Sequence, residues 1–217
     1  MCNRYAHRHT PSEIVAFFAV ALHPGVAEHL LRPNYNVAPR DKVPAVRKGP
    51  RRRELVGLHW GFELRGKIQM NGRSETAAVK PAFKDSLKAR RCLLPASGFF
   101  EWNHDNDGPP QPYYFYARDH APLALGAIWQ DDKVCILTCG PNAVLAPIHD
   151  RMPVLIQPAD FDQWLNAAND PQPLMKPAPD DLLTVHAVSK KINRVGVQGR
   201  ELLEPVTLEP RRQMELL

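Results

Sequence analysis

The sequence contains no run of uncharged apolar residues long enough to cross a membrane. A transmembrane helix needs about 18 such residues or more, and no stretch of the 217 residues approaches that length. The first residues, MCNRYAHRHT, also lack the apolar segment of a secretory signal peptide. We therefore expect a cytoplasmic protein with no membrane partner.

Cysteine is scarce, with four residues in the chain: Cys2, Cys92, Cys135 and Cys139. No pair has the C-x-x-C spacing typical of a zinc site, so the sequence predicts neither a metal nor a cofactor. Cys135 and Cys139 are four residues apart in a predicted strand and share one face, which favours a place in the core. The apolar neighbours of Cys92 favour the same place.

Helical patterns are few, and most of the chain reads as short strands. Thr10 to Glu13 form a capping box with proline at the first helical position, and apolar residues follow at helical spacing to Leu22 before His23-Pro24-Gly25 ends the helix. A second helix is predicted over 159–167. Strands are predicted over 43–47, 54–60, 92–94, 98–102, 113–118, 123–129, 133–139, 153–157 and 183–188.

These elements predict an α+β fold, with one β-rich domain over residues 1–217 and a few flanking helices. Strands do not alternate with long helices, which argues against βαβ units. Proline, at 22 residues, is about twice as common as usual and fits many loops and sheet edges.

The charge is unevenly placed along the chain. Residues 1–100 carry a net +11 and residues 101–217 a net −6, within an overall charge of +5. If the basic half forms one face, that face attracts phosphate. The alternative is that the two halves interleave in space and the asymmetry averages out.

Cys2 has a chemistry that no internal cysteine has. If Met1 is removed, Cys2 carries both an α-amine and a thiol, with reference pKa values near 8 and 8.5. The amine condenses with an aldehyde to an imine, and the neighbouring thiol closes a thiazolidine ring. The alternative is an incidental residue at the start of the chain.

Three polar residues stand out within apolar or constrained segments: Asn71, Glu101 and His149. Each has a structural explanation of its own. On that explanation, Asn71 would begin an Asn-Gly turn, Glu101 would be a surface carboxylate, and His149 would be a capped loop histidine. Each is also able to handle protons or hydrogen bonds, which suits a catalytic site.

Together with Cys2, these segments carry a resemblance. The motifs are Cys2-Asn3-Arg4, YNVAP at 35–39, Trp60-Gly61, NGRSET at 71–76, RCLLPASGFFEW at 91–102, ILT at 136–138, APIHDRMPV at 146–154, VSKKIN at 188–193 and ELLEP at 201–205. The chain resembles the SOS-response-associated peptidase family, also called abasic-site processing proteins. It departs from many members at Asn3 (often Gly), at Gly72 (often Ala), in a short 60–71 segment and in the stretch before ELLEP.

The resemblance implies a bifurcated sheet closed into a pseudo-barrel and a monomer that acts on abasic sites in single-stranded DNA. It implies a covalent thiazolidine crosslink through Cys2, with Schiff-base lyase activity and autocatalytic removal of Met1 as related reactions. Glu101 and His149 then move protons, and Asn71 holds the amine or the sugar.

The expected DNA contacts are of two kinds. Arg4, Arg73 and Arg151 adjoin motif residues, and arginine can grip phosphate with two hydrogen bonds; ordinary surface salt bridges are the alternative. Trp60 and Pro39 are expected to pack against bases, with a core position as the alternative for Trp60. Thr138 is expected to line the site.

Two other functions fit the same residues. Cys2, His149 and Glu101 suit a cysteine-type peptidase or amidase without a DNA substrate. A basic face also suits a single-strand-binding module without catalysis.

Overall fold

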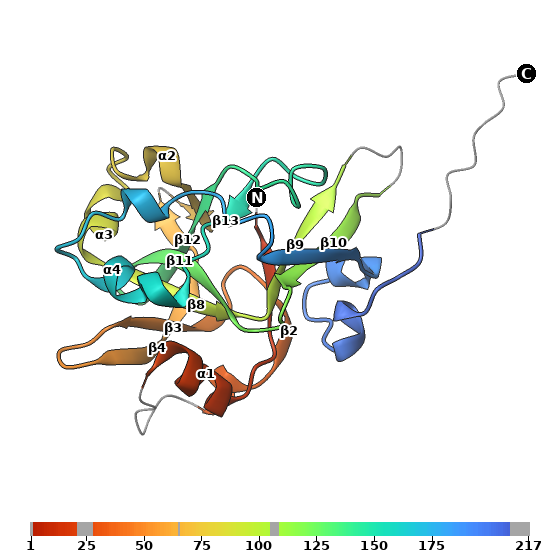
Figure 1. The fold of residues 1–217 in the computed structure, drawn as a ribbon, viewed down its shortest axis with the longest axis horizontal. Helices are drawn as coiled ribbons and strands as arrows, with labels where there is room; N and C mark the ends of the chain where they lie inside the picture. The colour runs from red at the N-terminus through yellow and green to blue at the C-terminus, as the bar shows by residue number, and fades with distance from the viewer. Residues whose placement is uncertain (1, 21–27, 65, 105–108, 209–217) are drawn as a thin grey trace, which may run out of the picture.

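The computed structural model describes residues 2–20, 28–64, 66–104 and 109–208, which fold into two main sheets flanked by short helices (Figure 1). The strands are β1 (Arg4–His7), β2 (Asn34–Val37), β3 (Lys42–Lys48), β4 (Arg53–Trp60), β5 (Phe62–Leu64), β6 (Lys67–Gln69), β7 (Asn71–Arg73), β8 (Arg91–Ala96), β9 (Gly98–Asn103), β10 (Gln111–Ala117), β11 (Leu123–Gln130), β12 (Lys133–Cys139), β13 (Met152–Pro153) and β14 (Leu183–Ala187). The α-helices are α1 (Pro11–Phe18), α2 (Ser74–Ala77), α3 (Lys84–Ala89) and α4 (Phe161–Leu165). Short 3-10 helices are η1 (Glu28–Leu31), η2 (Pro158–Asp160), η3 (Gln172–Leu174), η4 (Lys190–Asn193) and η5 (Arg200–Leu203).

The larger sheet closes on itself. Its strands pair in the order β11-β8-β3-β4-β12, and β12 pairs again with β11, which completes a ring of hydrogen bonds. β7 and β13 extend β12 beyond the ring. The predicted β-rich α+β fold is confirmed, and the closed sheet that the resemblance implies corresponds to this ring.

The smaller sheet has the order β14-β10-β9-β1-β2. The chain crosses from one sheet to the other between β8 and β9, at the buried Ser97. Ser97 also ties the sheets to β1, because its N–H donates to the carbonyl of Ala6 and its Oγ accepts from the N–H of Arg8. β1 therefore lies between β2 and β9, where it fixes the start of the chain.

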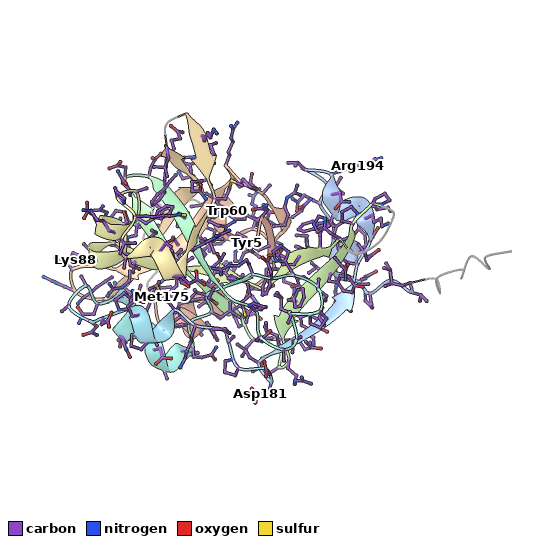
Figure 2. The ribbon with its side chains drawn as sticks, turned by 90° about the horizontal axis from the view of Figure 1, so that it is seen from above. Tyr5, Trp60, Lys88, Met175, Asp181 and Arg194 are labelled. Atoms are coloured by element: carbon purple, nitrogen blue, oxygen red, sulfur yellow. The ribbon has the colours of Figure 1, made fainter. Side chains whose placement is uncertain are left out.

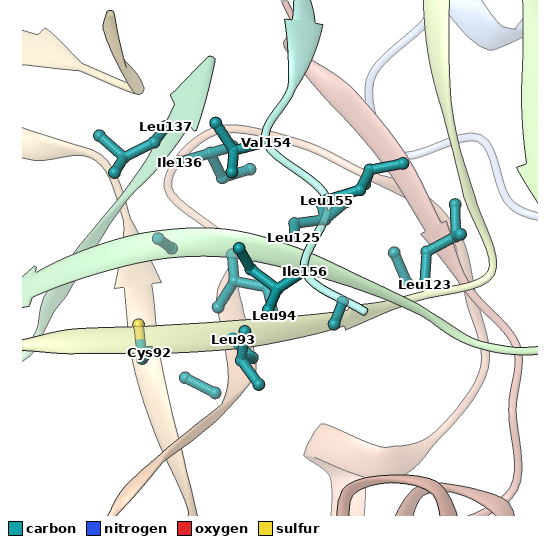
Figure 3. Close-up of a cluster of buried hydrophobic side chains, with 14 of the residues drawn as sticks. Cys92, Leu93, Leu94, Leu123, Leu125, Ile136, Leu137, Val154, Leu155 and Ile156 are labelled. Atoms are coloured by element: carbon teal, nitrogen blue, oxygen red, sulfur yellow. The ribbon is translucent and has the colours of Figure 1, made fainter. Parts of the chain in front are cut away.

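Apolar side chains fill the space enclosed by the larger sheet. Figure 3 shows β8, β11 and β12 contributing side chains to a cluster that the segment 154–156 covers. Cys92, Cys135 and Cys139 are buried in this core, as predicted. Burial of Cys135 raises the pKa of its thiol, so it stays protonated and inert.

A smaller cluster covers the outer face of the smaller sheet. Phe100 and Tyr114 of that sheet pack against Ile192 of η4 and Leu202 of η5. Arg194 follows η4 at one end of the molecule (Figure 2), and its carbonyl accepts a hydrogen bond from the Asn36 side chain of β2. This packing holds the chain beyond β14 against β1 and β2.

The first helix confirms its predicted start and corrects its predicted end. The capping box between Thr10 and Glu13 is present. However, α1 ends at Phe18 rather than Leu22, because Ala19 takes a left-handed conformation (φ 49°) and its N–H closes on Val15. The predicted stop at 23–25 lies outside the described residues. The second helix is confirmed by η2 and α4, with Phe161, Trp164 and Leu165 buried.

Candidate active site

Cys2 lies at the entrance to β1, fully buried at 0% exposure. Its main-chain carbonyl accepts a hydrogen bond of 3.0 Å from Asn71 Nδ2. Burial, and next the nearby Glu101 carboxylate, raise the pKa of the Cys2 thiol well above its usual range. The thiol is therefore a protonated group in a dry site, with a carboxyl group beside it.

Asn71 is held by the parallel pairing of β7 with β12, which places it opposite Ile136. Its Nδ2 donates to the Cys2 carbonyl and, at 3.1 Å, to Asn3 Oδ1. The bond to the Cys2 carbonyl fixes which amide atom is nitrogen, since a main-chain carbonyl can only accept. Asn71 is only 3% exposed, and its Oδ1 has no hydrogen-bond partner among the described residues. A buried acceptor left in this way can receive a bond from a bound donor.

Glu101 comes from β9, one residue beyond Phe100, which pairs with Arg4 of β1. That register puts the carboxyl group beside the start of the chain. The side chain is 1% exposed, and burial raises the pKa of Glu101 to about 8. A carboxylic acid with this pKa exchanges its proton near neutral pH, as a general acid or base must.

His149 reaches the same place from the loop before β13. Its Nε2 lies 3.6 Å from Glu101 Oε2. Its Nδ1 accepts a 2.9 Å bond from the main-chain N–H of Arg151, and also lies 3.1 Å from the exposed Asp150 carboxylate. The Arg151 N–H contact is the shortest of these and fits the tautomer with the proton on Nε2, facing Glu101. Nδ1 also lies 3.2 Å from the Arg151 carbonyl, a contact that fits the other tautomer. Burial lowers the pKa of His149 below its ordinary value, which keeps the ring neutral at pH 7.

Arg151 is tied to the protein by both terminal nitrogens of its guanidinium group. Nη1 and Nη2 bond the two oxygens of Glu75 at 2.7 and 2.9 Å, and Nη2 also donates to the carbonyl of Thr138 at 2.6 Å. Thr138 itself is fully buried, on β12. Arg151 is therefore held against β12 at Thr138 and against α2 at Glu75, a partner that the sequence did not single out.

The other expected DNA contacts lie at differing depths. Arg73 is exposed at the end of β7, and Pro39 is half-buried after β2. Arg4 is half-buried and donates to Asn36 Oδ1 at 2.7 Å and to the Ile192 carbonyl at 3.1 Å. Burial lowers the pKa of Arg4 somewhat. Arg73 is thus the most accessible of the three arginines.

Trp60 lies in the core, which was the alternative to its expected packing against a base. The indole is 1% exposed, packs on Tyr5 with ring centroids 5.4 Å apart, and donates from Nε1 to the Met70 carbonyl at 3.1 Å. Figure 2 shows Tyr5 and Trp60 close together in the middle of the molecule. In this position the ring cannot stack on a base, so its contribution is to hold the residue before Asn71.

Cys2, Asn71, Glu101 and His149 are thus brought together from four separate segments, at the junction of the two sheets. Among the described residues, no three His, Cys, Asp or Glu side chains are grouped so as to hold a metal ion. Within the same ranges, no helix is long and apolar enough to span a membrane.

Two residues of the site were missed from the sequence. Glu75 stands inside the NGRSET motif, and its spacing of four from Asn71 was the signal available. Asn3 was noted as a departure from the usual glycine, but its bond to Asn71 joins the start of the chain to β7, a long-range contact that no local pattern reveals.

Comparison with known proteins identifies the family of this chain. Residues 1–195 match the family model described as SOS response associated peptidase (SRAP). The chain is 28% identical to the abasic site processing protein YoqW of Bacillus subtilis over 224 residues, covering 94% of this chain and 99% of that protein. It is 28% identical to YedK, the abasic site processing protein of Escherichia coli, over 225 residues, covering 95% and 100%. For the abasic site processing protein HMCES of Gallus gallus the identity is 27% over 229 residues, covering 82% and 67%.

Solved structures share the fold. A protein from Bacteroides thetaiotaomicron superimposes with a TM-score of 0.84 at 19% identity, covering 95% of this chain and all of that one. A protein from Bordetella bronchiseptica gives 0.73 at 23% identity, covering 87% and 100%. The family match over most of the chain, together with the site geometry, shows that this protein belongs to the SOS response associated peptidase family.

Proposed function

We propose that this protein processes abasic sites in single-stranded DNA by forming a covalent thiazolidine crosslink through Cys2, once Met1 has been removed. The observation that carries the proposal is the convergence of Asn71, Glu101 and His149 on the start of the chain. The relatives named abasic site processing proteins support the choice of substrate. The protein then acts at DNA in the cytoplasm, as a monomer.

The reaction begins at the α-amine of Cys2. Its lone pair attacks the aldehyde carbon of the ring-opened deoxyribose, and loss of one water gives an imine. The thiol sulfur then adds to the same carbon while its proton passes to the imine nitrogen, which closes the five-membered ring. In sum, amine, thiol and aldehyde give a thiazolidine and one water, with no oxidant or reductant.

Asn71 is suited to hold the reacting amine. Its Nδ2 already bonds the Cys2 carbonyl, so the rest of the amide lies beside the main chain of that residue. The buried Oδ1 lacks a partner within the described structure and can accept from an amine N–H or a sugar hydroxyl. Held in this way, the amine meets the aldehyde without a further loss of rotational freedom.

Glu101 and His149 supply and remove the protons. The neutral carboxyl of Glu101, with its pKa raised to about 8 by burial, donates to the sugar ring oxygen and recovers the proton of the anomeric hydroxyl, so ring opening leaves it neutral. It then donates to the departing hydroxide and recovers a proton from the iminium nitrogen, which leaves the neutral imine. During ring closure it gives its proton to the imine nitrogen and takes the thiol proton in return. His149 Nε2 faces the same carboxyl at 3.6 Å and relays protons toward solvent.

Two related reactions share these groups. The imine makes the C2′ proton acidic, so β-elimination of the 3′ phosphate competes with ring closure, and that elimination is the lyase activity. Removal of Met1 needs a general acid or base next to the first peptide bond, and Glu101 lies beside Cys2.

Arginines guide the strand into the site. The exposed Arg73 is suited to grip a phosphate directly. Arg4 and Arg151 must loosen internal bonds, to Asn36 and Glu75, before they contact phosphate fully. Pro39, half-buried next to Arg40, is suited to pack against a base.

The thiol chemistry argues against the peptidase alternative. A cysteine hydrolase needs a thiolate, but burial and the nearby Glu101 raise the pKa of the Cys2 thiol. Ring closure on an imine does not need a standing thiolate, because the sulfur can lose its proton as it attacks. The aldehyde reaction therefore suits this environment better.

One assay separates the three functions. Mature protein is incubated with single-stranded DNA that carries an abasic site or an intact base in the same sequence. An adduct that survives SDS on the abasic strand supports the proposal, peptide turnover without an adduct supports a peptidase, and salt-sensitive binding without an adduct supports a binding module. Cys2→Ala keeps the amine but lacks the thiol, so it should give an imine that borohydride traps and no stable ring.

A further inference from the structure

We propose that Glu75 is a positioning residue for His149, acting through Arg151. The inference rests on the proposed function for its effect on the reaction, but the structural part stands on contacts within the protein. It concerns a residue whose carboxylate does not touch the reacting groups.

The first link is the ion pair. Glu75 lies on α2, directly after β7, and receives both terminal nitrogens of Arg151 at 2.7 and 2.9 Å. Such a two-point contact fixes the plane of the guanidinium as well as its position. Glu75 is half-exposed, whereas the Arg151 side chain is 14% exposed, so the pair reaches inward from the surface.

The second link runs through β12. Arg151 Nη2 also donates to the Thr138 carbonyl at 2.6 Å. The strand that carries Thr138 pairs with β7 on one side and with β13 on the other. One guanidinium therefore ties α2, β12 and the loop before β13 together.

The third link is the main chain of Arg151. Its N–H donates to His149 Nδ1 at 2.9 Å, which favours the tautomer with the ring proton on Nε2, toward Glu101, whereas its carbonyl, 3.2 Å from the same nitrogen, favours the other tautomer. The direction of that N–H depends on the turn from His149 to Arg151, and the turn is held from outside by the guanidinium. Loss of Glu75 would leave the side chain with Thr138 as its main partner and would loosen the turn.

Glu75 has a second conceivable effect, which the experiment must separate. A carboxylate beside a phosphate-binding surface repels DNA, so its removal strengthens binding. Positioning predicts a slower reaction at saturating DNA whatever the affinity, whereas repulsion alone predicts tighter binding and an unchanged or faster reaction.

The direct test is nuclear magnetic resonance of the His149 ring, without DNA. Long-range 1H–15N spectra at pH 8 should give wild-type His149 one protonated and one unprotonated nitrogen. In Glu75→Ala the two 15N shifts should move toward each other, as for a ring that exchanges between tautomers. In Glu75→Gln, which keeps one acceptor oxygen, the change should be intermediate.

The second readout is the rate of adduct formation with saturating abasic single-stranded DNA. We expect Glu75→Ala to be about tenfold slower than wild type, because a small misplacement of a proton-transfer group has effects of this size or larger. Glu204→Ala is the matched control, since it removes an exposed glutamate whose side chain bonds neither Arg151 nor His149 in the described part of the chain. Thermal melting of each variant shows that the fold is retained.

The adduct assay and the His149 spectra test different claims, so each can fail without the other. If wild-type protein forms no adduct, the proposed function is wrong, and the His149 spectra still decide the role of Glu75. Unchanged His149 shifts in folded Glu75→Ala and Glu75→Gln would overturn the positioning role. An unchanged or faster reaction in Glu75→Ala, with tighter DNA binding, would assign Glu75 to repulsion instead.

Discussion

His149 Nε2 lies 3.6 Å from Glu101 Oε2, which joins the loop before β13 to the smaller sheet beside Cys2. One group is an imidazole kept neutral by burial, and the other is a carboxylic acid with a raised pKa of about 8. Glu101 can therefore both donate and accept a proton near pH 7. This pairing gives the site its capacity to move protons in both directions.

Glu101→Gln should slow adduct formation by roughly a hundredfold, the usual scale of a lost general acid or base. The amide keeps the shape of the side chain but cannot exchange the proton. Rates at saturating abasic DNA measure the effect. A variant as fast as wild type would remove Glu101 from the proton transfers.

The same substitution should change stability in a pH-dependent way. Folding raises the pKa of Glu101 from 4.5 to about 8, so the folded state binds the proton more tightly, and this contribution is lost as pH rises from 4.5 through 8. Glu101→Gln has no such loss. Its gain in Tm over wild type should be larger at pH 9 than at pH 5, by about 4 °C or more.

His7 predicts sensitivity to acid. Burial lowers the pKa of His7 to about 4, and neither ring nitrogen has a hydrogen-bond partner among the described residues. The unfolded chain takes up the proton near pH 6.5, so stability falls as pH drops from 6.5 toward 4. At pH 5 the loss should be about 2 kcal/mol relative to pH 8. Urea unfolding should show this loss in wild type and not in His7→Leu; equal pH dependence would refute it.

Substitution of Asn71 tests whether its side chain holds Cys2 in place for the reaction. Asn71→Ala removes the donor to the Cys2 carbonyl and the unpartnered acceptor, so adduct formation should be about tenfold slower or more. Removal of the buried hydrogen bonds should also lower stability by about 1–3 kcal/mol. Asn3→Ala is the control, because it leaves the bond to Cys2 in place; an effect as large as that of Asn71→Ala would shift the role to Asn3.

Substitution by alanine should affect stability very differently at two glycines, Gly98 and Gly72. A methyl group on Gly98 would overlap the Phe115 carbonyl and the Tyr114 ring where β9 meets β10, so Gly98→Ala should lose about 2–3 kcal/mol. A methyl group on Gly72 meets Leu137 Cδ2 at 3.1 Å, the movable end of a side chain, and should change stability by less than about 1 kcal/mol. Melting curves of both variants check the packing between strands.

The longer elements were predictable from the sequence, and the shorter ones were not. β12 was predicted at its observed bounds of 133–139 because Val134 to Leu137 form an unbroken apolar run inside it. β1 and β7 were not predicted, because strands of four and three residues are too short to show an alternating pattern. Both pair with strands that are distant in sequence. β13 is shorter than the predicted 153–157, because that segment pairs mainly through single bridges such as Leu125 with Leu155.

For the site, the chemical groups were predictable from the sequence, but their arrangement in space was not. The chemistry of Cys2, Glu101 and His149 was readable from residue type and motif. Their mutual geometry depends on β1 lying between β9 and β2, which is a long-range pairing. Trp60 was expected to pack against a base, with a core position as the alternative, and its indole fills the core beside Tyr5.

The central claim is tested most directly by intact mass spectrometry of the protein after incubation with abasic single-stranded DNA. For protein that begins at Cys2, the account predicts a species with the mass of protein plus DNA minus one water, stable without borohydride. The same chain with Met1 retained should give none, because its Cys2 nitrogen lies within a peptide bond. Equal adduct formation by both forms, or by Cys2→Ala without reduction, would contradict the account.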